Sequence, residues 1–372
     1  MKIGLLGAGT IGFGVVELCN GTKDLEIIRV LDRRVIPGLE DRLTQKPEDI
    51  LNDPEIDTVV ELLGGVTPAF TWVEQALRSG KNVVTANKMM VSEKLPELLE
   101  AAQAGHSQLR FSAAVGGGIP FLYNLLRARR VDTVLSVEGI LNGTTNYILT
   151  RMQEEHAGYD EVLKDAQRLG YAEADPTADV SGMDTECKIM LASCIAWNGR
   201  INKREILREG IGQITQQDQD ATASMNRVLR LMARSLWTAQ GLRITVEPTL
   251  VSAASLPAGI RLVENMACWT GKNAGLQRFT GAGAGRYATA GAVVNDLMDL
   301  QDSGYPFTIE NRHLNICNDI PDRRYLVRGL DVAGTGMGAH ILTEPMAPSV
   351  IHRLAKERRE AGGSVFFAGL LE

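Results

Sequence analysis

The first part of the chain alternates short apolar runs with amphipathic segments. Residues 2–6 form an apolar run that ends in a glycine turn, and the segment behind it, FGVVELC, spaces its apolar residues as a helix does. The same alternation predicts strands at 57–65 and 81–88, a helix at 69–80 between them and a helix at 95–105. Strands that alternate with helices predict parallel βαβ units and a doubly wound sheet.

A second pattern begins near residue 131. Alternating apolar positions at 134–140 predict a strand, which a polar turn and a helix follow. The stretch 200–247 predicts a helix, then a polar loop, GQITQQDQD, and then a longer helix at 224–239. Residues 246–257 predict an extended segment, and one or two strands, a glycine-rich turn and another helix come after it.

We therefore expect an α/β protein of three parts. Residues 1–130 form a Rossmann-type, doubly wound parallel sheet, which a returning helix at 286–303 completes. Residues 131–285 form a second domain of the α+β class. Residues 306–372, with a short strand, a charged helix and a terminal apolar run, form a small C-terminal αβ appendage of unknown role.

Composition and charge argue against two classes of function. The net charge is −6 and the arginine pairs are scattered, so the chain offers no basic surface for nucleic acid. No stretch has the roughly 20 apolar residues that a membrane span needs. The 5 cysteines lack CxxC spacing and the N-terminus lacks a secretory-signal pattern, so we expect reduced thiols and a cytoplasmic protein.

The turn behind the first strand reads Gly7-Ala8-Gly9-Thr10-Ile11-Gly12. In a dinucleotide-binding unit the first glycine makes the turn, the second admits the pyrophosphate and the third lets helix and strand pack; a plain βα turn is the alternative. Asp32 ends the second strand, where a carboxylate takes the ribose hydroxyls of NAD. Arg33 and Arg34 follow directly and can accept the 2′-phosphate of NADP, so both cofactors stay open.

Three further segments can carry chemistry. Lys88 stands at the carboxyl end of a predicted strand, where ligands of such sheets bind, although a solvated lysine is commoner. Gly116–Gly118 can turn backbone groups toward a ligand or ion, or can form a sharp turn forced by packing. Asn142, Gly143 and Thr144 belong to a polar turn that can bind substrate or cap the next helix.

The segment 170–188, GYAEADPTADVSGMDTECK, places four carboxylates beside an apolar helix. Asp184 and Lys188 are four residues apart, so they share one face if the helix begins near residue 182. A surface salt bridge is the alternative, but the apolar neighbours predict a desolvated pair. Asp175 and Asp179 are expected to be ordinary loop and cap residues.

Six segments, in this order and spacing, resemble homoserine dehydrogenase: GLLGAGTIGFGVV, VVTANK, AVGGGIP, GILNGTTNYIL, LGYAEADPTADVSGMD..CK and FTGAGAG...TAGAVV.DL. The resemblance implies a small-molecule substrate: NAD(P)-dependent interconversion of L-aspartate 4-semialdehyde and L-homoserine, in the route to threonine, methionine and isoleucine. It also implies a homodimer or homotetramer in which residues 131–285 form the substrate and dimerisation domain. The alternatives are a related dehydrogenase of another small amino or hydroxy acid and a catalytically silent dinucleotide-binding paralogue.

The resemblance assigns roles to residues at matching positions. It implies that Lys88 and Lys188 are the two catalytic lysines and that Asp184 holds the substrate and Lys188 in place. It implies that Glu173 binds the substrate amino group. Donors from the turn at 142–146 can then meet the substrate carboxylate.

The resemblance also implies cofactor and cation contacts. Gly283 lies in the late glycine turn that reaches the cofactor, and the backbone carbonyls of Val115, Gly117 and Ile119 match a sodium site found in many members. Ser112 stands where an acidic residue is common, so a sodium site here would depend on carbonyls alone. The last 65 or so residues show no clear regulatory domain of the ACT type, and a truncated or degenerate version of one is the alternative. We therefore make no prediction of threonine feedback inhibition.

Overall fold

A computed structural model describes residues 1–302, 304 and 306–371. These residues form two compact units. The first unit comprises residues 1–131, 190–200 and 282–312, and the second comprises residues 132–189, 201–281 and those from 313 onward.

The first unit is built on a six-stranded parallel sheet in the order β3-β2-β1-β4-β5-β6. Its strands are β1 (Lys2–Leu6), β2 (Glu26–Leu31), β3 (Leu43–Thr44), β4 (Thr58–Glu61), β5 (Asn82–Thr85) and β6 (Leu109–Arg110). Its helices are α1 (Thr10–Asn20), α2 (Glu48–Leu51), α3 (Ala69–Arg78), α4 (Lys88–Ala104), α5 (Phe121–Ala128) and α12 (Arg286–Gln301), with 3-10 turns η1 (Glu40–Arg42) and η2 (Ser112–Ala114). This strand order confirms the predicted doubly wound, Rossmann-type sheet.

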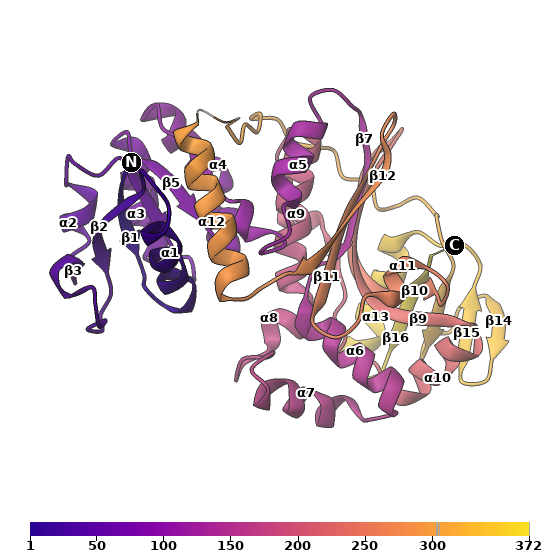
Figure 1. Ribbon diagram of the computed structural model, residues 1–372. Helices are drawn as coiled ribbons and strands as arrows, with labels where there is room; N and C mark the ends of the chain where they lie inside the picture. The colour runs from indigo at the N-terminus through magenta and orange to yellow at the C-terminus, as the bar shows by residue number, and fades with distance from the viewer. Residues whose placement is uncertain (303, 305, 372) are drawn as a thin grey trace. The chain divides into compact units, whose positions relative to one another are not determined.

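Apolar side chains between the sheet and its helices form the core of the first unit. Ile3, Val60 and Val84 have no exposed surface, as expected for parallel strands covered on both faces. Helices α1 and α12 lie side by side (Figure 1), and Val15 and Val293 from these two helices join the same core. A packed apolar core therefore supports the strands β1, β4 and β5 and fixes their carboxyl ends.

The second unit is built on a ten-stranded mixed sheet in the order β12-β11-β7-β9-β10-β16-β13-β15-β14, with β8 paired to β10. Its strands are β7 (Val134–Ile140), β8 (Leu207–Arg208), β9 (Arg227–Thr238), β10 (Gly241–Ser252), β11 (Glu264–Gly271), β12 (Gly275–Ala282), β13 (Tyr325–Arg328), β14 (Gly334–Met337), β15 (His340–Thr343) and β16 (Phe366–Leu370). The remaining helices are α6 (Gly143–Glu155), α7 (Tyr159–Arg168), α8 (Thr177–Val180), α9 (Met183–Trp197), α10 (Gln216–Ser224), α11 (Leu256–Gly259), α13 (Pro348–Glu360) and the 3-10 turn η3 (Lys203–Glu205). The strands from the end of the chain thus continue this sheet.

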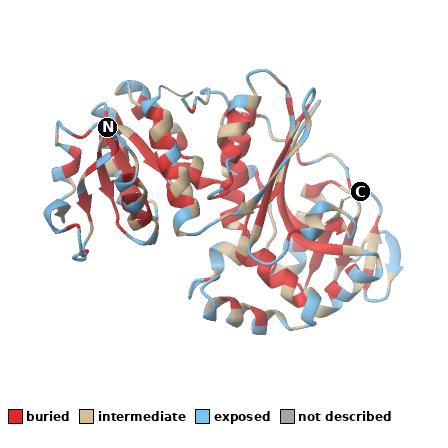
Figure 2. Ribbon diagram, in the orientation of Figure 1, coloured by how far each residue is buried: buried red, intermediate tan, exposed pale blue. Residues whose placement is uncertain are grey.

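Three predictions for the stretch 200–247 were wrong. The predicted helix before the polar loop is the 3-10 turn η3 followed by the short strand β8. The predicted helix at 224–239 is strand β9, which pairs with β7 on one side and β10 on the other. Its buried arginines, Arg230 and Arg234, recur at a spacing that suits a helix, and burial on both faces removes the alternation typical of a strand (Figure 2). The predicted polar loop contains helix α10, which begins at a capping box formed by Thr215 and Asp218.

Two other sequence features can be compared with the structure. The 5 cysteines all lie in the described ranges, where they form no disulfide, and four of them are buried. Within the described ranges, no helix has both the length and the apolar character needed to cross a membrane.

Candidate active site

Asp184 and Lys188 form a buried ion pair on the first turns of α9. The helix begins at Met183, so the two side chains share one face, and the Nζ of Lys188 lies 2.8 Å from the Oδ2 of Asp184. Asp184 is 4% and Lys188 7% exposed. Lys188 also donates to the carbonyl oxygen of Leu141 at 2.6 Å. This burial excludes the surface salt bridge that the spacing alone left open.

Asn142 connects this pair to two neighbouring elements. Its Oδ1 accepts the N–H of Thr145 at 2.8 Å and so caps α6, while its Nδ2 donates to Asp184 at 2.8 Å and to Asp179 at 2.7 Å. Asp179 was expected to be an ordinary loop residue, yet it shares the amide of Asn142 with Asp184. Its position at the end of the short helix α8 gave no signal of this contact in the sequence.

The loop before α8 carries Glu173 on its surface. Thr144 donates to the carbonyl of Tyr171 at 2.5 Å, and Gln167 donates to the carbonyl of Glu173 at 3.1 Å, so the backbone on either side of Ala172 is held in place. The side chain of Glu173 is exposed, unlike that of Asp184. Among the residues predicted for substrate, the second unit therefore brings Asn142, Asp184 and Lys188 into direct contact and leaves Glu173 outside that cluster.

The first glycine turn has the geometry that a pyrophosphate needs. Gly7 has a φ of +95°, and a Cβ on Gly12 would come within 2.1 Å of the Gly7 carbonyl oxygen, so both positions require glycine. A Cβ on Gly9 would meet nothing within 4 Å, which leaves its backbone open to a ligand. Among the described residues no side chain caps the N-terminus of α1, so its amides can face an anion. The turn therefore fits a dinucleotide.

Asp32 at the end of β2 is fully engaged by protein donors. Its carboxylate accepts the N–H of Ala8 at 3.1 Å and two side-chain N–H groups of Arg34, each at 3.0 Å. The guanidinium of Arg34 is the main cause that lowers the pKa of Asp32 from 3.8 to about 2. Arg34 remains 66% exposed, so one side of its guanidinium faces solvent beside the glycine turn.

Lys88 is the first residue of α4, directly after β5. Its neighbour Asn87 caps the helix and donates to the carbonyl of Gly65 at 2.6 Å and to Glu61 at 3.3 Å. Glu61, with no exposed surface, also accepts the hydroxyl of Thr85 at 2.6 Å, and burial raises the pKa of its carboxyl. This buried carboxylate, which the sequence analysis missed, fixes the end of β5 from which Lys88 projects.

The glycines at 116–118 pack tightly against the late glycine turn. A Cβ on Gly117 would come within 2.5 Å of the Gly283 carbonyl oxygen, so the two backbones touch and only glycine fits. Of the three predicted sodium ligands, Val115, Gly117 and Ile119, the carbonyl of Ile119 already accepts the N–H of Phe121 at 2.7 Å. No cluster of three acidic, histidine or cysteine side chains suited to a metal occurs in the described part of the chain.

Ser112 contacts a buried carboxylate that α12 supplies. Its N–H and hydroxyl donate to the two oxygens of Asp296, at 2.8 and 2.6 Å, beside a cavity of about 600 Å³ in the first unit. Asp296 is 1% exposed, and burial raises its pKa from 3.8 to about 6. Position 112 itself carries no acidic side chain, but α12 places the carboxylate of Asp296 next to it.

The raised pKa of Asp296 predicts a pH dependence of stability. Between about pH 4 and pH 6 the folded protein holds a proton that the unfolded chain has released, so the free energy of unfolding should fall as pH rises through this window, by about 3 kcal/mol in total. Asp296→Asn removes this titration and can still bond both groups of Ser112. Urea unfolding of the wild type and of Asp296→Asn at pH 4.5 and pH 7 measures the effect. If the difference in free energy of unfolding between the two proteins is the same at both pH values, the prediction is contradicted.

The comparisons with known proteins agree on one family. Residues 7–112 match the model of the homoserine dehydrogenase NAD-binding domain, and residues 120–298 match that of homoserine dehydrogenase. Homoserine dehydrogenase of Synechocystis sp. is 39% identical over 316 residues, which cover 81% of this chain and 73% of that protein. The enzyme of Bacillus subtilis is 34% identical over 312 residues, with coverage of 80% and 72%.

Solved structures of homoserine dehydrogenases have the same fold. A homoserine dehydrogenase from Thiobacillus denitrificans matches with a TM-score of 0.90 and 30% identity, covering 100% of this chain and 98% of that chain. A hyperthermophilic archaeal homoserine dehydrogenase solved in complex with NADPH matches in fold alone, with a TM-score of 0.71 and 22% identity, covering 82% of this chain and 99% of that chain.

Proposed function

Because the chain belongs to the homoserine dehydrogenase family, an NAD(P)-dependent oxidoreductase family that interconverts L-aspartate 4-semialdehyde and L-homoserine, we propose that Lys188 and Asp184 carry its proton chemistry. The observation that supports this proposal most directly is the buried 2.8 Å pair itself. The comparisons give no support to a dehydrogenase of another substrate or to a silent paralogue.

In this proposal the ammonium of Lys188 acts on the substrate oxygen. NADPH or NADH, held at the glycine turn, would supply the hydride, and negative charge would then develop on the oxygen of the aldehyde. A positioned ammonium stabilises that charge and donates the proton that completes the alcohol. Asp184 favours the charged form of Lys188, and the carbonyl of Leu141 fixes the direction of its Nζ.

Other residues bind the two ends of the amino acid. Glu173, exposed on its loop, offers a carboxylate to the substrate ammonium. The side chains of Asn142 and Thr144 already bond protein groups, so we assign the substrate carboxylate to the backbone amides of Gly143 and Thr144 in the first turn of α6. Lys88 adds a second ammonium at the carboxyl end of β5.

The assay is the oxidation of NADPH or NADH by the purified protein with L-aspartate 4-semialdehyde. Turnover that requires this substrate supports the assignment, and the absence of turnover with either cofactor would overturn it. A panel of hydroxy-acid carbonyl compounds, which lack the ammonium, and of amino aldehydes without a carboxylate should give much lower kcat/KM, since the proposed site recognises both groups.

For the cofactor we propose a preference for NADPH. Arg34, held by Asp32, and Arg33 beside it can bind the 2′-phosphate, and Arg34 also neutralises the carboxylate that would repel it. Arg34→Ala should raise the KM for NADPH about tenfold or more, since a hydrogen bond to a charged group is worth about 1.5–3 kcal/mol. The KM for NADH should stay unchanged or fall, because Asp32 becomes available to the ribose. Equal changes for both cofactors would contradict this preference.

Assembly, location and cation binding also belong to this proposal. A homodimer or homotetramer is proposed on the resemblance to the family, and light scattering of the purified protein tests it. A cytoplasmic location accords with the five free thiols. A sodium ion bound by the carbonyls of Val115, Gly117 and Ile119 is proposed in the same way, and direct binding measured by sodium-23 relaxation would test it without the activity of the enzyme.

A further inference from the structure

A short segment at 207–211 lies directly against the start of α9. Ile211 donates its N–H to the carbonyl of Val180 at 2.9 Å, and Arg208 donates from its Nη1 to the carbonyl of Ser181 at 2.8 Å. A Cβ on Gly210 would come within 2.3 Å of the Val180 carbonyl oxygen, so backbone packs on backbone here. The chain just before Met183, where α9 begins, is therefore fixed by this segment.

Arg208 extends the contact onto α9 itself. Its Nε lies 3.3 Å from the Oε1 of Glu186, which is 6% exposed and stands two residues after Asp184. Burial raises the pKa of the Glu186 carboxyl, and the charges of Arg208 and Lys203 oppose that rise. Two of the first four residues of α9 therefore contact other groups through their side chains. Asp184 contacts Lys188 and Asn142, and Glu186 contacts the 207–211 segment.

The C-terminal helix α13 contacts the same segment through an ion pair. Arg359 donates from Nη1 and Nη2 to the two carboxylate oxygens of Glu209, at 3.0 and 2.7 Å. The side chain of Glu209 is 12% and that of Arg359 33% exposed, so this two-bond pair is largely shielded from solvent. Such a forked contact fixes orientation as well as distance, which a lysine cannot do.

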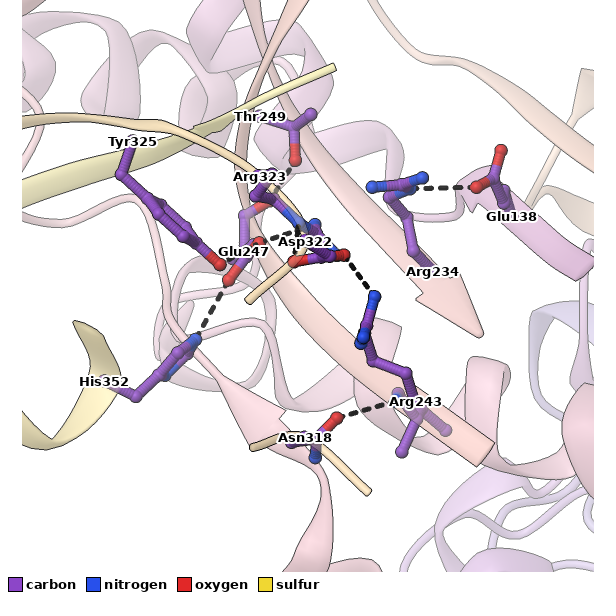
Figure 3. A network of polar contacts seen from close by, with 11 residues as sticks. Glu138, Arg234, Arg243, Glu247, Thr249, Asn318, Asp322, Arg323, Tyr325 and His352 are labelled. Carbon is purple, nitrogen blue, oxygen red and sulfur yellow. Dashed lines mark hydrogen bonds and ion pairs between the residues drawn. The ribbon is translucent and has the colours of Figure 1, made fainter. Parts of the chain in front are cut away.

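A second contact from α13 supports the first. His352 stands seven residues before Arg359, two turns away on the same face of the helix, and its Nε2 lies 3.0 Å from the Oε2 of Glu247 on β10 (Figure 3). The residue before Glu247, Val246, accepts the N–H of Glu209 at 2.8 Å. Helix α13 is therefore anchored at two points to the strands that carry the 207–211 segment.

Arg359 is the main group that favours the charged form of Glu209. Burial raises the pKa of the Glu209 carboxyl, and the negative charge of Glu247 acts in the same direction. Arg359 is the largest opposing influence, followed by the charge of His352, both from α13. Without Arg359 the carboxylate of Glu209 would be a buried charge beside another buried carboxylate.

We propose that Arg359 is a positioning residue for the dehydrogenase reaction: through Glu209 it holds the 207–211 segment, and through that segment the start of the helix that presents Asp184 and Lys188. This inference rests on the roles proposed above for Asp184 and Lys188. It gives the C-terminal region, whose function the sequence left open, a part in catalysis without any contact to substrate or cofactor.

Arg359→Met tests the inference, because it keeps the length of the side chain and removes the charge. We expect kcat with L-aspartate 4-semialdehyde to fall about tenfold at pH 8, since small displacements of reacting groups lower rates strongly, while the KM for NADPH stays within twofold. Arg359→Lys should recover only part of the loss. The matched control is Arg353→Met on the same helix, whose side chain is 60% exposed and pairs with Glu357 within the helix; its kcat should not change.

The pH profile separates positioning from a general loss of stability. In Arg359→Met, Glu209 is charged and unpaired at high pH but neutral at low pH, so the ratio of wild-type to variant kcat should grow as pH rises. The double variant Arg359→Met, Glu209→Gln should remove this pH dependence and restore part of kcat. The inference would be overturned if the ratio of wild-type to variant kcat is constant with pH and the second substitution restores no kcat. A normal kcat in Arg359→Met would also overturn it. If Arg359→Met fails to fold, a normal kcat in both Arg359→Lys and Glu209→Gln would do the same.

This outcome can be distinguished from a failure of the proposed function. If Lys188→Ala loses activity and Arg359→Met does not, only the role of Arg359 is wrong. If Lys188→Ala keeps full activity, the proposed chemistry itself is wrong, whatever Arg359 does.

Discussion

Replacing Lys188 by alanine should lower kcat for the reduction of L-aspartate 4-semialdehyde by about 10³-fold. The expected loss combines the proton that the ammonium donates, typically worth about 10²–10⁴-fold, with its stabilisation of the charged oxygen. The KM for NADPH should change little, because the role proposed for Lys188 is proton transfer to the substrate and not cofactor binding. Steady-state kinetics with saturating cofactor measures the effect.

The variant needs two controls, because it leaves Asp184 buried without its cation. Lys188→Ala, Asp184→Asn removes both charges and should be equally inactive while unfolding closer to the wild type. Lys164→Ala removes an exposed lysine from α7 and should keep normal kcat. A Lys188→Ala protein that is folded and retains kcat within threefold would exclude this lysine from the chemistry.

Replacing Arg323 by methionine should destabilise the second unit by about 3–5 kcal/mol. Its Nη1 lies 2.9 Å from Glu247, and the two side chains are 4% and 0% exposed (Figure 3). Loss of one partner leaves a buried carboxylate unpaired, which costs far more than loss of a surface pair. His352 and Tyr325 also contact Glu247, so they offset part of the cost.

Urea unfolding followed by tryptophan fluorescence measures this change. Arg353→Met, which breaks an exposed pair on α13, is the matched control and should change the free energy of unfolding by less than about 1 kcal/mol. Arg323→Met combined with Glu247→Leu should be less destabilised than Arg323→Met alone, since no buried charge is then unpaired. Equal unfolding of Arg323→Met and the control would show that the buried pair adds no stability.

The sequence was sufficient for the first unit because its signals are local. An apolar run, a glycine turn and an amphipathic helix each lie within some 20 residues, and the strand order follows from repeated βαβ units. The second unit depends on pairing across long separations. Strand β9 carries arginines that are buried against other segments, and no local pattern distinguishes Arg230 or Arg234 from the polar face of a helix.

The candidate site divides in the same way. The spacing of Asp184 and Lys188 predicted their contact, because both lie on one helix. The contacts of Asp179, Glu61 and Asp296 could not be predicted, because each carboxylate meets its partner only through the fold. The partners are Asn142, 37 residues away, Thr85, 24 away, and Ser112, 184 away. Burial of a carboxylate depends on what covers it, and that information is absent from its neighbours in sequence.

The second sheet cannot be completed during synthesis until strand β16 has left the ribosome. This strand lies between β10 and β13, and it pairs with β10 in parallel and with β13 antiparallel. While the ribosome still holds residues 366–370, the part of β10 that pairs with β16, at Thr249 and Leu250, stays open, and α13 has no finished sheet to dock on. An open, apolar strand edge attracts other chains. A nascent chain stalled before Phe366 should therefore bind holdase chaperones and show no dehydrogenase activity, although its nucleotide-binding unit has long been synthesised.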